Sequence, residues 1–169
     1  MSQRTESGRP VELRGRLDAG SGRFAIVASR FNDLVTERLT EGARAALLQH
    51  DVPETAIDTI SVPGAWELPQ AVERVARTGR YAAVIAVGCV IRGETPHFDF
   101  IAAEAARGLG AAARATGVPI TFGVLTTDTA EQALARAGGA KGNKGWDAAL
   151  AALEMADLFR RLGGAGAGT

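Results

Sequence analysis

The sequence predicts a three-layer α/β/α protein built on a four-stranded parallel sheet. Two observations support this prediction: apolar, β-branched runs alternate with segments of helical periodicity, and the connections between them are short. Strands that alternate with helices form βαβ units, whose right-handed crossovers place helices on both faces of a parallel sheet. The chain has 169 residues, 46% of them hydrophobic, so it can bury a core, and we expect a single domain over residues 1–169.

The first half of the chain predicts two strand–helix pairs. Phe24 to Ser29 is the first strand candidate, and a helix follows residues 32–33, an Asn-Asp pair whose side chains suit an N-cap. Ile57 to Val62 is the second strand candidate. Its helix is expected from about Glu67 to Arg77, with Gly79 placed to end it.

The second half continues the alternation. Tyr81 to Gly88 is the most continuous apolar run, which predicts a strand buried on both faces. The remaining predicted elements are a helix from near Phe98 to Ala115, a strand over Ile120–Leu125, a short helix over Thr129–Ala137, a glycine-rich loop over Gly138–Gly145 and a last helix over Trp146–Leu162.

The two ends of the chain differ from this pattern. In Val11 to Leu17, apolar residues alternate with charged ones, which predicts a half-exposed strand with no obvious partner inside the chain. We expect it to pair with the sheet edge of a neighbouring subunit; the alternative is a loosely attached arm. Residues 1–10 and 163–169 are expected to be flexible.

Composition excludes several classes of function. The 19 basic and 19 acidic residues cancel, which argues against nucleic acid as a partner and removes one defence against self-association. A single cysteine, Cys89, cannot form an internal disulfide and fits a reducing cytoplasm. The longest nearly apolar stretch, Tyr81 to Ile91, is too short to span a bilayer, so we expect no membrane association.

Parallel sheets bind ligands beyond the carboxyl ends of their strands, so the sequence also nominates a site. The segments that leave those ends are residues 30–32, 63–67, 89–98 and 126–128. Gly93, Thr95 and Pro96 favour a helix start whose amide groups face an anion, with Thr95 as a possible cap. His97 suits proton transfer at neutral pH, although a histidine at a helix start can also simply bond a carboxylate.

Other side chains near these ends suit a flat, polar ligand. Phe31, Trp66 and Phe122 can stack on a heterocycle, although Phe122 is as easily a core residue. Glu67 can accept hydrogen bonds from ligand hydroxyls, or simply favour a helix N-terminus. Arg136, Lys141 and Lys144 flank flexible glycines and can hold a phosphate, or form an ordinary solvated loop. The spacing of His97, Asp99 and Cys89 matches no known metal site.

Several longer motifs follow one another in a fixed order: Arg30-Phe31-Asn32, the segment from Val62 to Pro69, the segment from Gly88 to Asp99, the segment from Phe122 to Thr127, Arg136-Ala137-Gly138 and Gly142-Asn143-Lys144-Gly145. In these motifs the chain resembles the 6,7-dimethyl-8-ribityllumazine synthase family over about residues 11–162. The resemblance implies a flavodoxin-like fold and the penultimate step of riboflavin biosynthesis. In that step, 5-amino-6-(D-ribitylamino)uracil condenses with 3,4-dihydroxy-2-butanone 4-phosphate, and phosphate and water leave, without a cofactor or metal.

The resemblance also implies roles for single residues. Those implied for the pyrimidine and its ribityl chain are Phe31, Ala65, Trp66, Glu67, Cys89, Val90, Ile91, Phe122 and Lys144. Those implied for the butanone phosphate are Glu94, Thr95 and Arg136. His97 would be the proton shuttle, the contacts of Cys89, Val90 and Ile91 would be made by backbone groups, and a neighbouring subunit would supply Phe122 and Arg136. Cys89 and Trp66 depart from the residues often found at their positions.

The resemblance further implies assembly. Members of the family form homopentamers, and some build a 60-subunit shell of twelve pentamers; the short Gly138–Gly145 loop is similar to the shell-forming kind. Riboflavin synthase is then a candidate partner. The rival interpretations are a flavin or lumazine carrier, an inactive shell protein and an archaeal-type riboflavin synthase. The presence of both His97 and Arg136, together with an intact Arg92–Asp99 segment, favours the synthase.

Overall fold

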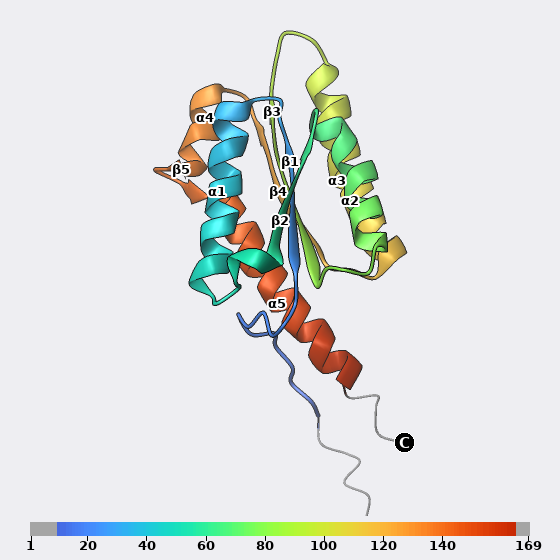
Figure 1. Ribbon diagram of the computed structural model, residues 1–169. Coiled ribbons are helices and arrows are strands. Elements are labelled where there is room, and N and C mark those ends of the chain that lie inside the picture. Colours follow the sequence, from blue (N-terminus) through green and yellow to red (C-terminus); the bar gives the residue numbers. More distant parts are fainter. Residues whose placement is uncertain (1–9, 165–169) are drawn as a thin grey trace, which may run out of the picture.

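The structure is a computed structural model that describes residues 10–164 (Figure 1). Within that range, four strands form one sheet in the spatial order β2-β1-β3-β4, and every neighbouring pair is parallel. The strands are β1 Phe24–Ser29, β2 Ile57–Val62, β3 Ala83–Ile91 and β4 Ile120–Thr127. The predicted four-stranded parallel sheet is therefore confirmed.

Helices cover both faces of this sheet, which gives the expected three-layer, flavodoxin-like arrangement (Figure 1). The helices of one face are α1 Asp33–Gln49, α4 Ala130–Ala135 and α5 Lys144–Gly164, and those of the other are α2 Leu68–Arg77 and α3 His97–Thr116. The short elements are η1 Glu54–Ala56, η2 Ala65–Glu67, β5 Ala137–Gly139 and β6 Gly142–Asn143. Across residues 10–164, no helix has both the length and the apolar character that crossing a membrane requires.

Two apolar clusters fill the spaces between the sheet and its helices. Strand β3 lies between them, and Ala83–Val90 is buried throughout because helices cover both of its faces. Side chains alternate across the strand, so Ile85 packs toward α1 and α5 while Val84 packs toward α2 and α3. This double burial is the physical reason for the continuous apolar run.

The third strand differs from its predicted bounds of Tyr81–Gly88. It begins two residues later, because Tyr81 lies before the strand and its hydroxyl donates a hydrogen bond to Asp58 Oδ2 at 2.7 Å. It ends three residues later, because Cys89–Ile91 continue to pair with β4 as far as Thr127. The carboxyl ends of β3 and β4 therefore extend beyond the predicted edge of the sheet.

The segment after β4 also differs from prediction. Its helix α4 is shorter than Thr129–Ala137, and the predicted loop Gly138–Gly145 contains a small antiparallel hairpin of β5 and β6. Helix α5 begins at Lys144 rather than Trp146, because Asn143 Oδ1 accepts hydrogen bonds from the amide groups of Gly145 at 2.8 Å and Trp146 at 3.1 Å. A tertiary contact stabilises this turn, since Asn143 Nδ2 donates to the Arg38 carbonyl of α1 at 3.0 Å.

Two predicted helix caps are wrong in their chemistry. Asn32 does occupy the N-cap position of α1, but its backbone is left-handed (φ 63°) and its side chain bonds elsewhere. At the start of α3 the N-cap residue is Pro96 rather than Thr95, and within the described chain no side chain caps this helix. Both departures lie at the carboxyl ends of the strands, where the site is expected.

The N-terminal segment is extended but forms no strand within residues 10–164. It lies along α5, where the Arg16 amide donates to Asp157 Oδ2 at 2.7 Å and Arg161 Nη1 donates to the Arg14 carbonyl. Val11, at the far end of this arm, is 85% exposed. The arm is thus anchored to its own chain, and its pairing with a neighbouring subunit stays a prediction.

The predicted flexible ends fall almost entirely outside the described residues. Of 163–169, only Gly163 and Gly164 are described, and both belong to α5 instead of a loose tail. Of 1–10, only Pro10 is described, and it is exposed. The last helix therefore extends two residues past its predicted end at Leu162.

Candidate active site

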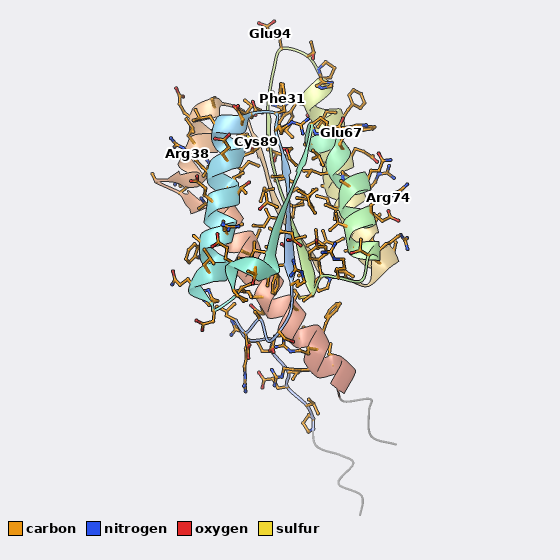
Figure 2. All side chains as sticks on the ribbon, viewed as in Figure 1. Phe31, Arg38, Glu67, Arg74, Cys89 and Glu94 are labelled. Carbon is orange, nitrogen blue, oxygen red and sulfur yellow. The ribbon has the colours of Figure 1, made fainter. Side chains whose placement is uncertain are left out.

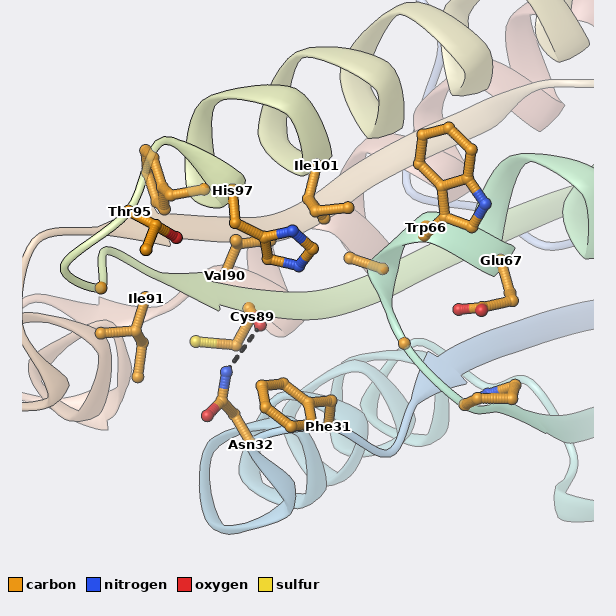
Figure 3. A pocket seen from close by; sticks show the side chains of 15 residues that line it. Phe31, Asn32, Trp66, Glu67, Cys89, Val90, Ile91, Thr95, His97 and Ile101 are labelled. Atoms are coloured by element: carbon orange, nitrogen blue, oxygen red, sulfur yellow. Dashed lines mark hydrogen bonds between the residues drawn. The ribbon is translucent and has the colours of Figure 1, made fainter.

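A cleft of about 710 Å³ lies at the carboxyl ends of the strands, where the sequence nominated a site (Figure 3). It opens between β1, β3, η2 and the start of α3. The lining residues are Phe31, Asn32, Pro63, Gly64, Ala65, Trp66, Glu67, Cys89, Val90, Ile91, Gly93, Thr95, His97, Phe98 and Ile101. The residues come from three separate segments of the chain, which the parallel sheet brings to one edge.

The unpaired edge of β3 forms the floor of the cleft. The register of β3 with β1 ends at the pair of Ala28 and Val87, whereas its register with β4 continues to Ile91. Along Gly88–Ile91, the edge of β3 away from β4 is therefore open in the part of the chain that the structure describes. Backbone donors and acceptors on such an edge can bind a polar ring.

Asn32 bonds the first group of this open edge. Its left-handed backbone, a conformation that asparagine tolerates better than most residues, turns the side chain toward β3 (Figure 3). There Asn32 Nδ2 donates to the Cys89 carbonyl at 2.9 Å. That oxygen keeps a second lone pair for a ligand. Asn32 was predicted only as a helix cap, and the positive φ that redirects it has no direct signature in the sequence.

Two aromatic rings border the cleft from different loops. Phe31 is 72% exposed and Trp66 is 55% exposed, which is unusual for side chains of this size. Stacking on a flat ligand would remove both rings from water and stabilise the complex. Glu67 follows Trp66 in η2, and its carboxylate points into the same cleft (Figure 3). This part of the site suits a ring that carries hydroxyl groups.

His97 is the first residue of α3 and is exposed. Its imidazole points into the cleft on the side opposite Phe31, with Val90 and Ile101 beside it (Figure 3). Thr95 lines the cleft just before the helix begins. An imidazole in this place can exchange protons with a ligand bound between the rings and β3.

Arg92, which was not predicted as a site residue, contacts three residues around this helix start. Its Nε donates to Asp128 Oδ1 at 2.8 Å and its Nη1 donates to Asp99 Oδ1 at 3.2 Å. Its guanidinium lies 4.3 Å from the centre of the Phe98 ring. The hydrogen bond to Asp128, with the nearby charge of Asp99, raises the pKa of Arg92. The sequence holds one signal for this network, because residues that end adjacent parallel strands must lie close together.

The Cys89 side chain belongs to the core, as predicted. The residue is only 2% exposed and packs with the apolar cluster beneath α1 and α5. Burial raises the pKa of the Cys89 thiol to about 11, so the thiol is neutral near pH 7. Its contribution to the cleft is therefore its backbone.

The structure brings most of the predicted site residues together, and leaves four outside the cleft. The residues outside it are Glu94, Phe122, Arg136 and Lys144. Glu94 stands at the tip of the loop before α3 (Figure 2), and Phe122 is 49% exposed on the edge strand β4. Arg136 ends α4 and Lys144 starts α5, both in the layer on the other side of the sheet from α3. None of these four lines the cleft of its own chain, although Glu94 lies between two residues that do, Gly93 and Thr95.

The described part of the chain contains no cluster of side chains suited to binding a metal ion. Among residues 10–164, His, Cys, Asp and Glu side chains form no group of three or more that could hold a metal ion. Beside the cleft, Asp99 and Asp128 are both paired with Arg92.

A parallel α/β sheet whose strand ends carry two exposed aromatic rings and an imidazole belongs to the α/β proteins that bind small molecules beyond the carboxyl ends of their strands. Comparison with known proteins narrows this class. The family model of 6,7-dimethyl-8-ribityllumazine synthase matches residues 21–160. The proteins of that name from Chloroherpeton thalassium and Gemmatimonas aurantiaca are 52% and 58% identical to the chain, each over 89% of its length and over 97% and 92% of their own. The chain belongs to the 6,7-dimethyl-8-ribityllumazine synthase family, so the predicted resemblance is confirmed.

Proposed function

We propose that the protein is a 6,7-dimethyl-8-ribityllumazine synthase, a transferase that condenses 5-amino-6-(D-ribitylamino)uracil with 3,4-dihydroxy-2-butanone 4-phosphate. Membership of the family supports this activity. The structural observation that supports it most is the cleft itself, which is lined by two exposed aromatic residues, the open edge of β3 and the His97 imidazole. The reaction forms the lumazine and releases phosphate and water.

The pyrimidine binds between β3 and the two exposed aromatic rings, Phe31 and Trp66. Phe31 and Trp66 stack on or border the ring, and backbone groups of Cys89, Val90 and Ile91 bond its polar edge. Glu67, with Ala65 and Trp66, holds the ribityl chain by accepting hydrogen bonds from its hydroxyls. Beyond Val87, β3 no longer pairs with β1. Its backbone groups on that edge can therefore form hydrogen bonds with a ligand, which supports this arrangement.

His97 acts as the proton shuttle. The 5-amino group attacks the ketone, and the resulting carbinolamine must gain and lose protons before the imine forms, phosphate leaves and the second ring closes. An exposed imidazole at the cleft can supply these transfers, which typically contribute about 10²–10⁴-fold. Holding two reactive substrates together contributes more, up to roughly 7–11 kcal/mol in favourable cases.

A neighbouring subunit completes the phosphate and pyrimidine sites. Thr95 and Glu94 stand at the start of α3, where free amide groups favour an anion. Arg136 and Phe122 lie outside the cleft of their own chain, which supports their use by the next copy, and we propose Lys144 as a further residue of the pyrimidine site. We propose a homo-oligomer built from pentamers, either as single pentamers or as twelve of them in a 60-subunit shell, with the arm around Val11 pairing with a neighbour's sheet.

We also propose a cellular compartment and a protein partner for the reaction. The buried Cys89 thiol fits a reducing cytoplasm. Riboflavin synthase, which consumes the lumazine, is the partner that we propose for the assembly. A pull-down of the tagged oligomer with riboflavin synthase, at increasing salt, tests this association.

The test of the activity is direct. Purified protein given both substrates should form a green-fluorescent lumazine and release one phosphate for each product molecule. A lack of phosphate release at every enzyme concentration would overturn the proposal. Binding of the pyrimidine or of a lumazine without turnover would indicate a carrier instead.

A further inference from the structure

The start of α3 is held in an unusual way. Its N-cap residue is Pro96, and no side chain in residues 10–164 caps its free amide groups. The residues from Arg92 to His97 are all exposed, so packing does not fix the loop before the helix. Yet His97, the first residue of this helix, must be aimed into the cleft. Burial of Phe98 packs the first turn onto the apolar cluster beneath α2 and α3, but it does not join this turn to β4.

The Arg92 side chain makes that connection through three contacts. Its guanidinium stacks 4.3 Å from the centre of the ring of Phe98, the residue after His97. Its Nη1 donates to Asp99 in the same first turn at 3.2 Å, and its Nε donates to Asp128 just past β4 at 2.8 Å. The Arg92 amide also donates to the Thr127 carbonyl at 2.8 Å, which ties its backbone to β4. One residue thus joins β3, β4 and α3.

These contacts distinguish Arg92 from a phosphate ligand. The guanidinium is a planar fork, and two of its nitrogens are already bonded to the carboxylates while its face covers Phe98. It also balances the charges of Asp99 and Asp128, which would otherwise repel a phosphate bound near Thr95. A lysine could keep the charge but could not make both hydrogen bonds and stack.

We propose that Arg92 is a positioning residue, which fixes the first turn of α3 against β4 and so aims His97 at the substrates. The proposal rests on the proposed synthase activity. It assigns Arg92 no contact with substrate. Misplacing a reacting group by about 1 Å can cost on the order of 100-fold in rate, so the loss of this network should appear in kcat.

The first experiment separates turnover from binding. Arg92→Ala should lower kcat by on the order of 10- to 100-fold, with KM for the pyrimidine substrate changed less than about twofold. Arg44→Ala is the matched control, since Arg44 joins α1 to Glu54 by an exposed pair far from the cleft. The control should keep wild-type kcat. An unchanged kcat in Arg92→Ala, or a rise in KM alone, overturns the proposal.

The second experiment asks whether Arg92 acts through His97. If it does, Arg92→Ala should have little further effect in a His97→Ala background, because the group that it aims is gone. Turnover of the double variant should lie within about threefold of His97→Ala alone. A further loss as large as that of Arg92→Ala in the wild type would mean an independent role and overturn the proposal.

Two conservative variants keep the proposal testable where Arg92→Ala unfolds or fails to assemble. Asp128→Asn leaves the arginine in place and weakens only the link to β4, so it should reproduce part of the loss in kcat. Arg92→Lys should restore thermal stability more fully than kcat, since it restores charge without the fork. Wild-type kcat in both variants would overturn the proposal. A wild-type protein without activity would instead refute the synthase assignment, which keeps the two failures distinct.

Discussion

Single residues at the cleft make contacts that the sequence around them does not predict. Asn32 stands at a helix N-cap, yet its left-handed backbone sends its amide to the Cys89 carbonyl. Cys89 in turn buries its thiol and leaves its backbone to the cleft. In both cases the side chain and the backbone of one residue have different partners, since the Asn32 carbonyl accepts from the first turn of α1 while its side-chain amide bonds β3. A substitution at Asn32 or Cys89 therefore has two separate effects, one on the backbone contacts of the residue and one on its side-chain contacts.

His97→Ala tests the catalytic role at this scale. We expect kcat to fall about 10²–10⁴-fold while the pyrimidine still binds, because stacking and backbone contacts do not involve the imidazole. Steady-state kinetics measures the first quantity, and fluorescence titration with a non-reacting lumazine measures the second. A loss of binding as large as the loss of kcat would contradict the separation of roles.

Because the Cys89 thiol is buried, we expect the free energy of unfolding to fall at alkaline pH. Burial raises its pKa in the folded state above the value of an unfolded thiol, to about 11. Its contribution to stability is then fully present below about pH 9 and is lost as the pH rises toward 11. Iodoacetamide should label the native thiol slowly at pH 8 and rapidly in denaturant. A Cys89→Ala variant should lose this part of the alkaline instability, which denaturation curves at pH 8 and 10 can check.

At the scale of elements, close approach of helices depends on small residues. A Cβ at Gly108 in α3 would lie 2.6 Å from Pro69 Cβ in α2, whereas a Cβ at Gly110 would meet only Arg114 Nη1 at 3.6 Å. Two glycines of one helix, two residues apart, thus have different reasons to be there. Gly108 allows α2 and α3 to pack closely. Gly110 makes no such contact and only lowers the stability of the helix.

This difference predicts opposite effects of the same substitution. Gly108→Ala should destabilise the protein by about 1–3 kcal/mol, because the helices must move apart. Gly110→Ala should stabilise it by about 0.5–1 kcal/mol through the better helix propensity of alanine. Chemical denaturation at one fixed protein concentration compares the two variants with the wild type. Equal changes in the free energy of unfolding would mean that the helices do not approach as closely as described.

The elements themselves were largely predictable, and the departures share one cause. The strands Phe24–Ser29 and Ile57–Val62 follow directly from short apolar runs bounded by turn residues. The start of α5 and the first turn of α3 depend instead on Asn143 and Arg92, which bond residues far away in the sequence, and the end of β3 depends on its pairing with β4. Local patterns carry no information about such partners. The same limit explains why Phe31 and Trp66 were found in advance and Asn32 and Arg92 were not.

At the scale of the whole molecule, the protein is expected to act only as an assembly. Light scattering should give about five chain masses for a pentamer or about sixty for a shell. A monomer with full activity would contradict a site that is shared between copies. The exposed Phe122 and the position of Arg136 away from the cleft are the observations that favour the shared site.

Mixed assemblies offer a sharper test of shared sites. Arg136→Ala should mainly raise KM for the butanone phosphate, and His97→Ala should mainly lower kcat. If neighbours share sites, subunits of the two variants dissociated and reassembled together should regain activity. In a random equal mixture, roughly a quarter of the sites in a cyclic ring combine an intact imidazole with an intact arginine. Mixing without reassembly is the control, and the absence of any recovery would contradict the shared site.

The contact between Arg14 and Arg161 has a practical consequence for handling this protein. It brings the first and last described segments to one end of the molecule, opposite the cleft (Figure 1). A reporter or affinity label fused directly before Pro10 or after Gly164 would start from that end of the subunit and should not obstruct substrate entry. A short linker joining the two termini, with new ones opened in a surface turn, should likewise give a circularly permuted chain that still folds.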